Sequence, residues 1–192
     1  MTDNLDAFLR VLDPADNSTG GGAASALAGA MAAALAAMVA RLSLGRPGLE
    51  PEAFYRDIAA QGQDLATGLM AGGQEDCLAF DAVRAAYGLP RQTEEQKAAR
   101  REAIDKALLQ ASLVPLKNAE QCGRVLELAR QLEGRSNPRA GSDLECAFFL
   151  ARAGLQGCLA NVKINLPGLR DQAQAEEIKK RAAELSRADE GV

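Results

Sequence analysis

The side chains that could move protons in this 192-residue chain do not include histidine, because the sequence contains none. This excludes Ser-His-Asp and Cys-His triads as well as histidine-ligated metal sites. Acid–base chemistry must then use Asp, Glu, Lys, Tyr, Cys or water. Asp76 is the most informative candidate, since it lies four residues before Phe80 on the apolar stripe of a predicted helix. A carboxylate there is paired with an arginine, exposed by a different helix register, or buried with a raised pKa suited to proton transfer.

Three consecutive glycines, Gly20, Gly21 and Gly22, come directly before an apolar helix. Such a segment exposes backbone N–H groups at a helix N-terminus, where a ligand can bind them. It lacks the lysine of a P-loop and the spacing of a dinucleotide-binding fingerprint, and no strand is predicted before it. Two interpretations remain open: a ligand-binding loop, or a turn that packs tightly against another helix.

Polar residues also mark the predicted start of a later helix. Ser142 with Glu145 predicts a capping box, and Asp143 favours the positive end of the same helix. Asn137 and Pro138, just before it, predict a turn. These residues therefore have a structural explanation before any functional one.

Asn161 and Asn165 are four residues apart and share one face if this segment is helical. Buried amides need hydrogen-bond partners, which either the backbone or a ligand can supply. The segment from 161 to 168 is ambiguous, so a helix junction and a binding surface both remain possible interpretations.

The elements that must position these residues are helices. Ala, Leu, Glu, Gln and Arg dominate, and Val, Ile and Thr are few, which favours an all-α single-domain bundle over residues 1–192. Thr93 with Gln96 predicts a capping box, and Asp171 predicts the cap of the last helix, whose Ile178 and Leu185 point inward. The predicted helices cover approximately residues 5–12, 23–42, 52–87 with a possible break at Gly72-Gly73, 94–132 with a kink or restart at Pro115, 142–160, and a last helix from 172.

The helix over 23–42 is uncharged up to Ala40 and apolar on all sides, which predicts a buried central helix. Alanines recur at every fourth position and allow neighbouring helices to approach closely. The larger side chains form a second stripe, made of Leu27, Met31, Leu35, Met38 and Leu42. The uncharged stretch is long enough to cross a bilayer, but its Ala and Gly are poorly hydrophobic, so we expect no membrane insertion.

Charge and cysteine usage exclude several other classes of protein. The net charge is −4 with both signs interspersed, so we expect no nucleic acid partner. Cys77, Cys122, Cys146 and Cys158 match no zinc or disulfide framework, which indicates free thiols in a reducing cytoplasm. The polar, acidic N-terminus does not look like a signal peptide.

Taken in order, these segments resemble the formiminotransferase-cyclodeaminase/methenyltetrahydrofolate cyclohydrolase family. The resemblance covers nearly the whole chain, although no single motif decides it. The family usually has Pro before the glycines and often Ser after them, where this chain has Thr19 and Ala23. The matching segments are Gly20-Gly21-Gly22 with helix 23–41, Asp76 through Ala79-Phe80, Leu89-Pro90, Thr93, Arg100, Pro115-Leu116, Ser142-Asp143, and Asn161 through Leu166 ending at Asp171.

The resemblance implies an all-α homodimer that binds a tetrahydrofolate derivative near the glycine loop and needs no metal or other cofactor. Such proteins either interconvert 5,10-methenyl- and 10-formyl-tetrahydrofolate or close 5-formimino-tetrahydrofolate with loss of ammonia. Because no formiminotransferase domain is evident, the cyclohydrolase is favoured. The alternatives are a cyclodeaminase, a non-catalytic folate-binding protein and a dimerisation module. The dimer interface stays open, since the Ala-rich helix could lie there or in the core.

Under this resemblance, one carboxylate carries protons between water and the leaving nitrogen. We assign that role to Asp76, with Asp143 as the reserve. Gly20, Gly21 and Gly22 would hold water, the pterin or an anionic group. Ser142, Asn137, Asn161 and Asn165 are the remaining candidates for binding substrate, the three asparagines at the pterin edge.

Overall fold

The computed structural model describes residues 19–190, and these confirm the all-α prediction, since none of them forms a strand. The predicted helix near residues 5–12 lies outside the described residues. The elements are α2 (Gly21–Ser43), α3 (Glu52–Tyr87), α4 (Glu94–Leu132), the 3-10 helix η2 (Pro138–Ala140), α5 (Gly141–Asn165), the 3-10 helix η3 (Leu166–Gly168) and α6 (Gln172–Glu190).

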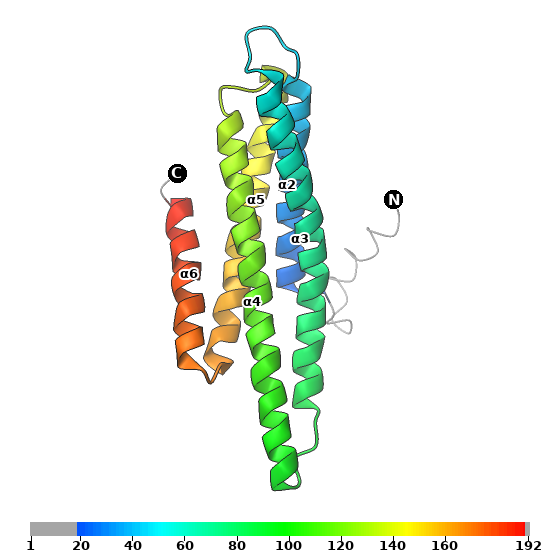
Figure 1. Ribbon diagram of the computed structural model, residues 1–192, viewed down its shortest axis with the longest axis vertical. Coiled ribbons are helices and arrows are strands. Elements are labelled where there is room, and N and C mark those ends of the chain that lie inside the picture. Colours follow the sequence, from blue (N-terminus) through cyan, green and yellow to red (C-terminus); the bar gives the residue numbers. More distant parts are fainter. Residues whose placement is uncertain (1–18, 191–192) are drawn as a thin grey trace.

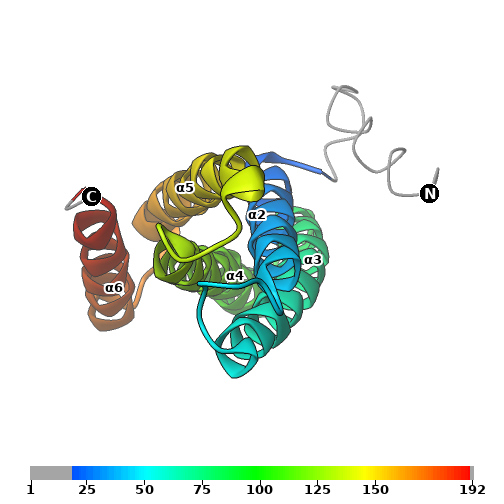
Figure 2. The same ribbon diagram turned by 90° about the horizontal axis from the view of Figure 1, so that it is seen from above.

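Helices α2 to α5 form an elongated four-helix bundle, seen end-on in Figure 2. Helix α2 lies between α3 and α5 and also touches α4 across the interior. Helix α6 packs outside the bundle against α4 and α5 (Figure 1). The α3–α4 hairpin extends past the first turn of α2, so the bundle has four helices at one end and an open hairpin at the other.

The bundle is narrow at α2 because small residues line its contacts. A Cβ atom placed on Gly29 of α2 would lie 2.4 Å from the Cys122 sulfur of α4. On Gly154 of α5, a Cβ would lie 2.9 Å from the carbonyl oxygen of Ser25. Both distances are shorter than any real contact, so the predicted close approach of neighbouring helices to this segment is confirmed.

Helix α2 is the predicted central helix, and its Ala and Gly face is buried. The prediction that α2 is buried on all sides is wrong for the stripe of larger side chains. Met31 is 48% exposed and Leu42 is 44% exposed. By length and composition α2 could cross a membrane, and half of its most apolar window is buried against the other helices. The small residues face inward because only they fit the narrow interior, which leaves the larger ones outside.

The possible break of α3 and the possible restart of α4 do not occur in the described helices. Helix α3 runs unbroken through Gly72 and Gly73, because both glycines pack against neighbouring helices and this packing outweighs their low helix propensity. Helix α4 likewise continues through Pro115 as one element. The ambiguous segment after Ala160 continues α5 to Asn165 and then tightens into η3.

The predicted helix caps have mixed outcomes. Thr93 and Gln96 form the capping box of α4, and Asp171 Oδ1 accepts hydrogen bonds from the backbone N–H groups of Ala173 and Gln174 at the start of α6. The capping box predicted at Ser142 and Glu145 is wrong. Helix α5 begins at Gly141, directly after η2, and no side chain caps it.

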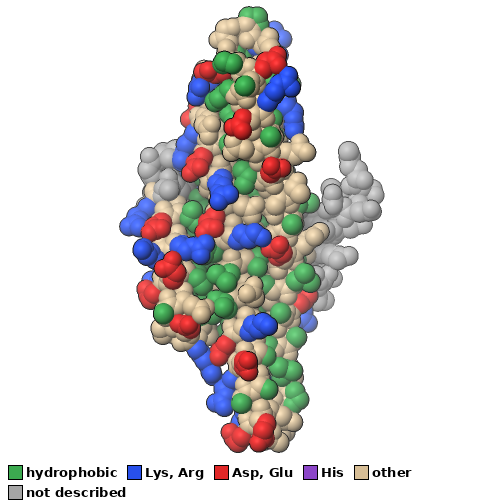
Figure 3. Space-filling model, in the orientation of Figure 1, with side chains coloured by type: hydrophobic (Ala, Val, Ile, Leu, Met, Phe, Trp, Pro, Cys, Tyr) green, Lys and Arg blue, Asp and Glu red, His purple; other side chains and the backbone are tan. Residues whose placement is uncertain are grey.

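Charged side chains of both signs alternate over the face shown in Figure 3. Several form exposed ion pairs, such as Lys117 Nζ with Glu75 Oε2 at 3.1 Å. Pairs of this kind contribute little to stability in water. The pattern agrees with the mixed charge distribution expected from the sequence.

Candidate active site

The first turn of α2 begins at a glycine and is capped by a neighbouring helix. Gly20 is the N-cap and provides no side chain, and the carboxylate of Asp76 on α3 accepts a hydrogen bond from the backbone N–H of Ala23. A carboxylate near these N–H groups is also favoured by the positive end of the helix dipole. Asp76 thus satisfies a backbone donor that α2 itself leaves unpaired.

Gly22 allows this contact. A Cβ atom on Gly22 would lie 2.3 Å from Asp76 Oδ2, well inside contact distance. Gly22 therefore supports the interpretation that this segment packs tightly against another helix. A ligand-binding loop also stays possible, since Gly20 has nothing within 4 Å of its Cβ position.

Asp76 is half-buried between α2 and α3. Burial raises the pKa of its carboxyl, and the hydrogen bond from the Ala23 N–H opposes this and lowers it. A carboxyl with a raised pKa can hold a proton closer to neutral pH and exchange it with a substrate. Of the three alternatives open for Asp76, its half-buried position and the direction of its pKa favour the buried carboxyl.

Thr19 occupies the position before the glycines and lies against the thiol of Cys77. Burial raises the pKa of Cys77, the hydrogen bond with Thr19 lowers it, and the negative charges of Asp76 and Asp81 raise it further. A hydroxyl group is thus present beside the candidate site from Thr19. Ser25, two residues after Ala23, donates its hydroxyl to the Gly21 carbonyl oxygen at 2.6 Å.

Asn161 lies on α5 at the same level as the glycines. Its Nδ2 is 3.5 Å from the position of a Cβ on Gly21, and it donates a hydrogen bond to the Gly157 carbonyl oxygen at 2.9 Å. An amide has two N–H donors and one acceptor oxygen, so this one bond does not use its full capacity. Asn161 is therefore placed to contact a ligand at the first turn of α2.

Asn165, one turn further along α5, has a structural partner. Its Nδ2 donates to the Ala111 carbonyl oxygen of α4 at 2.7 Å. That carbonyl lacks its usual helical donor because the residue four positions later is Pro115, which has no N–H. The amide of Asn165 thus replaces a missing backbone hydrogen bond near the candidate site.

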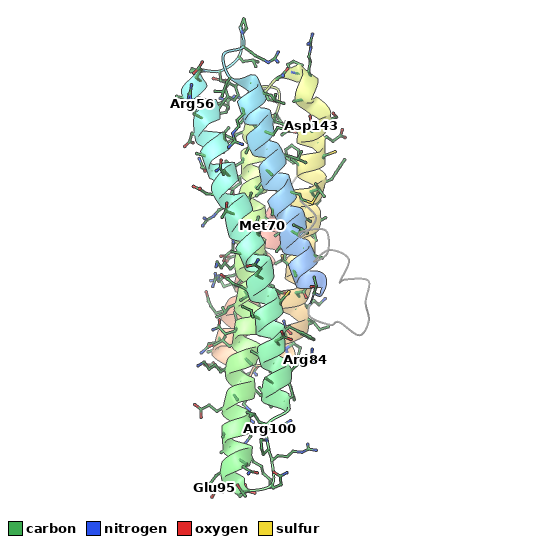
Figure 4. The ribbon with its side chains drawn as sticks, turned by 90° about the vertical axis from the view of Figure 1, so that its right-hand side faces the viewer. Arg56, Met70, Arg84, Glu95, Arg100 and Asp143 are labelled. Atoms are coloured by element: carbon green, nitrogen blue, oxygen red, sulfur yellow. The ribbon has the colours of Figure 1, made fainter. Side chains whose placement is uncertain are left out.

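The remaining predicted residues lie at the opposite end of the bundle. Asp143 is near the top of Figure 4, whereas Arg84 and Arg100 mark the hairpin end. Ser142 is exposed beside Asp143 in the first turn of α5. The 23 residues of α2 separate the two ends by about 34 Å. Within one subunit, Asp143 and Ser142 therefore do not join Asp76.

Asn137 also lies at that distant end and is 3% exposed. Its side chain donates to the Leu42 carbonyl oxygen and accepts from the Arg139 N–H, and its backbone N–H donates to the Ser43 hydroxyl. These bonds join the end of α2 to η2. The structure thus gives Asn137 a complete structural role.

A separate groove of about 680 Å³ runs between α5 and α6. Its lining is largely apolar and includes Leu159, Leu166 and Ala182, with Lys163 and Lys179 at its edges. None of the predicted site residues lines it. The groove is therefore not the place where Asp76 could act.

Asn118 is a polar residue at this end of the bundle that the sequence reasoning missed. It is fully buried on α4, next to Gly72 of α3. Its spacing from Pro115 and Cys122 puts it on an apolar helical stripe, as Asp76 is on α3. That spacing was the available signal.

Comparison with known proteins decides the family. The sequence model described as formiminotransferase-cyclodeaminase matches residues 4–184. The chain belongs to this family. A methenyltetrahydrofolate cyclohydrolase from Methylorubrum extorquens is 39% identical over 176 residues, covering 91% of this chain and 85% of that protein.

Two further members of the formiminotransferase-cyclodeaminase family are similar to the chain. The formimidoyltransferase-cyclodeaminase of Rattus norvegicus is 31% identical over 183 residues, covering 95% of this chain and 34% of that protein. The chain therefore spans about a third of that relative. The solved structure of formiminotetrahydrofolate cyclodeaminase from Thermotoga maritima has a TM-score of 0.84 at 27% identity, covering 95% of this chain and 87% of that chain. The fold expected from the family resemblance is confirmed.

Proposed function

We propose that this protein is a methenyltetrahydrofolate cyclohydrolase that hydrolyses 5,10-methenyl-tetrahydrofolate to 10-formyl-tetrahydrofolate. The observation that carries the proposal is the half-buried Asp76 carboxyl at the glycine-rich start of α2, with its pKa raised by burial. The relative from Methylorubrum extorquens, which matches along most of both chains, supports this activity among those of the family.

The proposed chemistry needs one carboxylate and one water. The methenyl carbon is electrophilic, and water adds to it while Asp76 takes one of the water protons. The tetrahedral carbon then expels N5, and Asp76 returns its proton to that nitrogen. The remaining hydroxyl proton passes to solvent as the formyl C=O forms, so the cationic substrate gives a neutral product and one released proton.

The binding roles proposed for the other residues follow their positions. The backbone N–H groups of Gly21 and Gly22, in the first turn of α2, lie at the same end of this helix as Asp76 and would hold water, the pterin or an anionic group. Asn161 would bind the pterin edge with the part of its amide that remains free. Asn165, held by the Ala111 carbonyl, would contribute through its acceptor oxygen.

We further propose that the protein is a homodimer that pairs through the outer face of α2. Met31 and Leu42 of α2 and Met70 of α3 are apolar side chains that are 40–48% exposed. Helix α2 and Met70 lie on the side of the molecule that faces the viewer in Figure 4. Apolar faces of this kind are typical of subunit interfaces.

Antiparallel pairing of two α2 helices would also account for the distant candidates. It would bring the Asp143 end of one subunit beside the Gly21 end of the other. In that arrangement Ser142 and Asp143 of one chain act in the site formed by Asp76 of its partner chain. In a homodimer of this geometry, the residues around Asp76 and the pair Ser142 and Asp143 would both contribute to one site.

The decisive assay follows the disappearance of 5,10-methenyl-tetrahydrofolate by absorbance, with the uncatalysed hydrolysis subtracted. Wild type should act above background, Asp76→Asn should not, and Asp81→Asn should match wild type, because Asp81 is an exposed carboxylate on the same helix. If the wild type gave no loss above background, the cyclohydrolase proposal would be wrong.

The alternative activity is that of the formiminotetrahydrofolate cyclodeaminase, whose solved structure from Thermotoga maritima matches this fold. Incubation with 5-formimino-tetrahydrofolate and detection of released ammonia distinguishes the two. Ammonia release without methenyl hydrolysis would favour the deaminase. Folate binding without either reaction would favour a non-catalytic binding protein.

A further inference from the structure

Asn118 has a buried amide with no partner. The residue is 0% exposed, and neither its Nδ2 nor its Oδ1 atom has a hydrogen-bond partner among the described residues. Buried side-chain amides are nearly always paired with protein groups or with ordered water, because an unpaired polar group in the interior is costly. An amide kept in this position therefore points to a bound polar molecule.

The chain makes room for this amide from a second helix. A Cβ atom on Gly72 of α3 would lie 1.9 Å from Asn118 Oδ1 and 3.0 Å from Nδ2. Only glycine at this position lets the carboxamide lie against the α3 backbone. Gly72 is one helical turn, about 6 Å along the axis, from Asp76.

Asp76 lies on the same face of α3 as Gly72, four residues earlier, and its carboxyl packs against the first turn of α2. Its charge acts on the thiol of Cys158 on α5, which is 0% exposed and hydrogen-bonded to Cys122 of α4. Cys122 is one turn along α4 from Asn118. Asn118, which packs against Gly72, thus lies within one helical turn of Asp76 as measured along α3, and its amide is unpaired.

We propose that Asn118 is a positioning residue for Asp76, acting through one ordered water held between the Asn118 carboxamide and the Asp76 carboxyl. Asn118 Nδ2 donates to the water oxygen, and the water donates to a carboxylate oxygen of Asp76. This water fixes the orientation of the carboxyl and favours its ionised form. The inference rests on the proposed function, because it assigns Asn118 to the same site.

Among the described residues, the thiols of Cys77 and Cys158 are the groups whose titration the charge of Asp76 influences. Cys77 follows it directly on α3 and is itself influenced by Asp81, and the charge of Asp76 also acts on Cys158 of α5, which is hydrogen-bonded to Cys122 of α4. Helix α2 contributes the Ala23 N–H, which does not titrate. The neighbouring carboxylate of Glu75 is paired with Lys117, so the titration of Asp76 has to be followed by the signal of its own carboxyl.

The test compares Asn118→Leu, of similar volume but apolar, with Ser112→Ala. Ser112 is an equally buried residue of α4 whose hydroxyl is already paired with the Leu108 carbonyl oxygen. We expect Asn118→Leu to unfold close to the wild-type temperature, because an apolar side chain of similar volume replaces both the amide and the water that it holds. Its kcat should fall about tenfold with KM changed less than about threefold, while Ser112→Ala keeps the wild-type values.

The pKa of Asp76, followed by the carbon-13 shift of its carboxyl, gives a readout independent of turnover. In Asn118→Leu it should rise by about half a unit or more, because a donor to the ionised form is lost. An unchanged pKa together with wild-type kcat would overturn the proposal. If Asn118→Leu does not fold, Asn118→Ala is measured in its place. If the wild type lacks cyclohydrolase activity, the proposed function fails, whereas the titration still decides the link between Asn118 and Asp76.

Discussion

The amide of Asn165 on α5 completes the hydrogen bonding that Pro115 interrupts in α4. Its Nδ2 donates to the Ala111 carbonyl oxygen at 2.7 Å, in place of the N–H that a proline lacks. A side chain in one helix thus repairs the backbone of another. This contact fixes the end of α5 against α4, close to the turn that carries Asn161.

The first prediction concerns this repair. Asn165→Ala should lower the free energy of unfolding by about 1–2 kcal/mol, because it leaves a carbonyl of Ala111 unpaired. In Pro115→Ala the helix supplies its own N–H, so adding Asn165→Ala to that variant should cost much less. Urea unfolding of the four proteins measures the coupling. Strictly additive effects would show that Pro115 and Asn165 are independent.

The second prediction concerns Gly22. Gly22→Ala should reduce kcat by about tenfold or more, because its Cβ would lie 2.3 Å from Asp76 Oδ2 and displace the carboxyl. Gly141→Ala is the matched control, since it lies in a helical first turn with nothing within 4 Å of its Cβ position. Gly141→Ala should leave activity unchanged and stabilise the protein slightly. Equal effects of the two substitutions on activity would contradict the contact.

The third prediction follows from the raised pKa of Asp76. A group whose pKa is higher in the folded than in the unfolded state stabilises the fold at low pH, and that contribution is lost as the pH rises through the folded pKa. Asp76→Asn removes this loss and keeps an oxygen that can accept from the Ala23 N–H. It should therefore be as stable as wild type at low pH and more stable at neutral pH, although inactive. Unfolding of both proteins at acid and neutral pH checks this, and a neutral-pH stability below wild type would argue against it.

The fourth prediction concerns the proposed dimer. Met31→Lys introduces a charge into the exposed apolar face of α2 and should shift the protein to monomers in analytical ultracentrifugation. Leu78→Lys is the control, because Leu78 is an exposed residue of α3, and it should leave the assembly unchanged. A dimer that survives Met31→Lys would place the interface elsewhere.

The fifth prediction tests whether two subunits share a site. Asp76→Asn and Asp143→Asn should each be inactive as homodimers. After mixing and subunit exchange, half of the dimers are mixed, and one of their two sites keeps both carboxylates, so about a quarter of wild-type activity should return. If activity does not return, or Asp143→Asn is active alone, Asp143 has no part in the site of the partner chain.

Features governed by neighbouring residues were predicted well from the sequence. The caps at Thr93 and Asp171 depend on three or four residues, and the helical composition alone predicted the fold class. Ser142 failed as a cap because η2 leads directly into α5, which a capping pattern does not reveal. The possible break at Gly72 is absent because this glycine packs against Asn118. The sequence could not show this contact, since the two residues are 46 positions apart.

The site was harder to predict because motif order does not measure distance. Gly22 and Asp76 meet because α2 and α3 pack side by side, whereas the apolar stripe indicated only that Asp76 lies on the inner face of its helix. Asp143 follows in the same ordered set of motifs but lies beyond the other end of α2. The length of that helix separates them, and the sequence could not show which ends of the helices meet.

Because α3 and α4 continue past the first turn of α2, they alone form the tip of their hairpin among residues 19–190. There Arg100 holds Tyr87 by a hydrogen bond to its carbonyl oxygen at 3.1 Å and by stacking 5.6 Å above its ring. Two helices joined by so few contacts open locally far more often than a four-helix section, so backbone amides near Tyr87 should exchange with deuterium long before those near Leu69. Asp76 stands at the boundary between the slowly and the rapidly opening parts of the molecule.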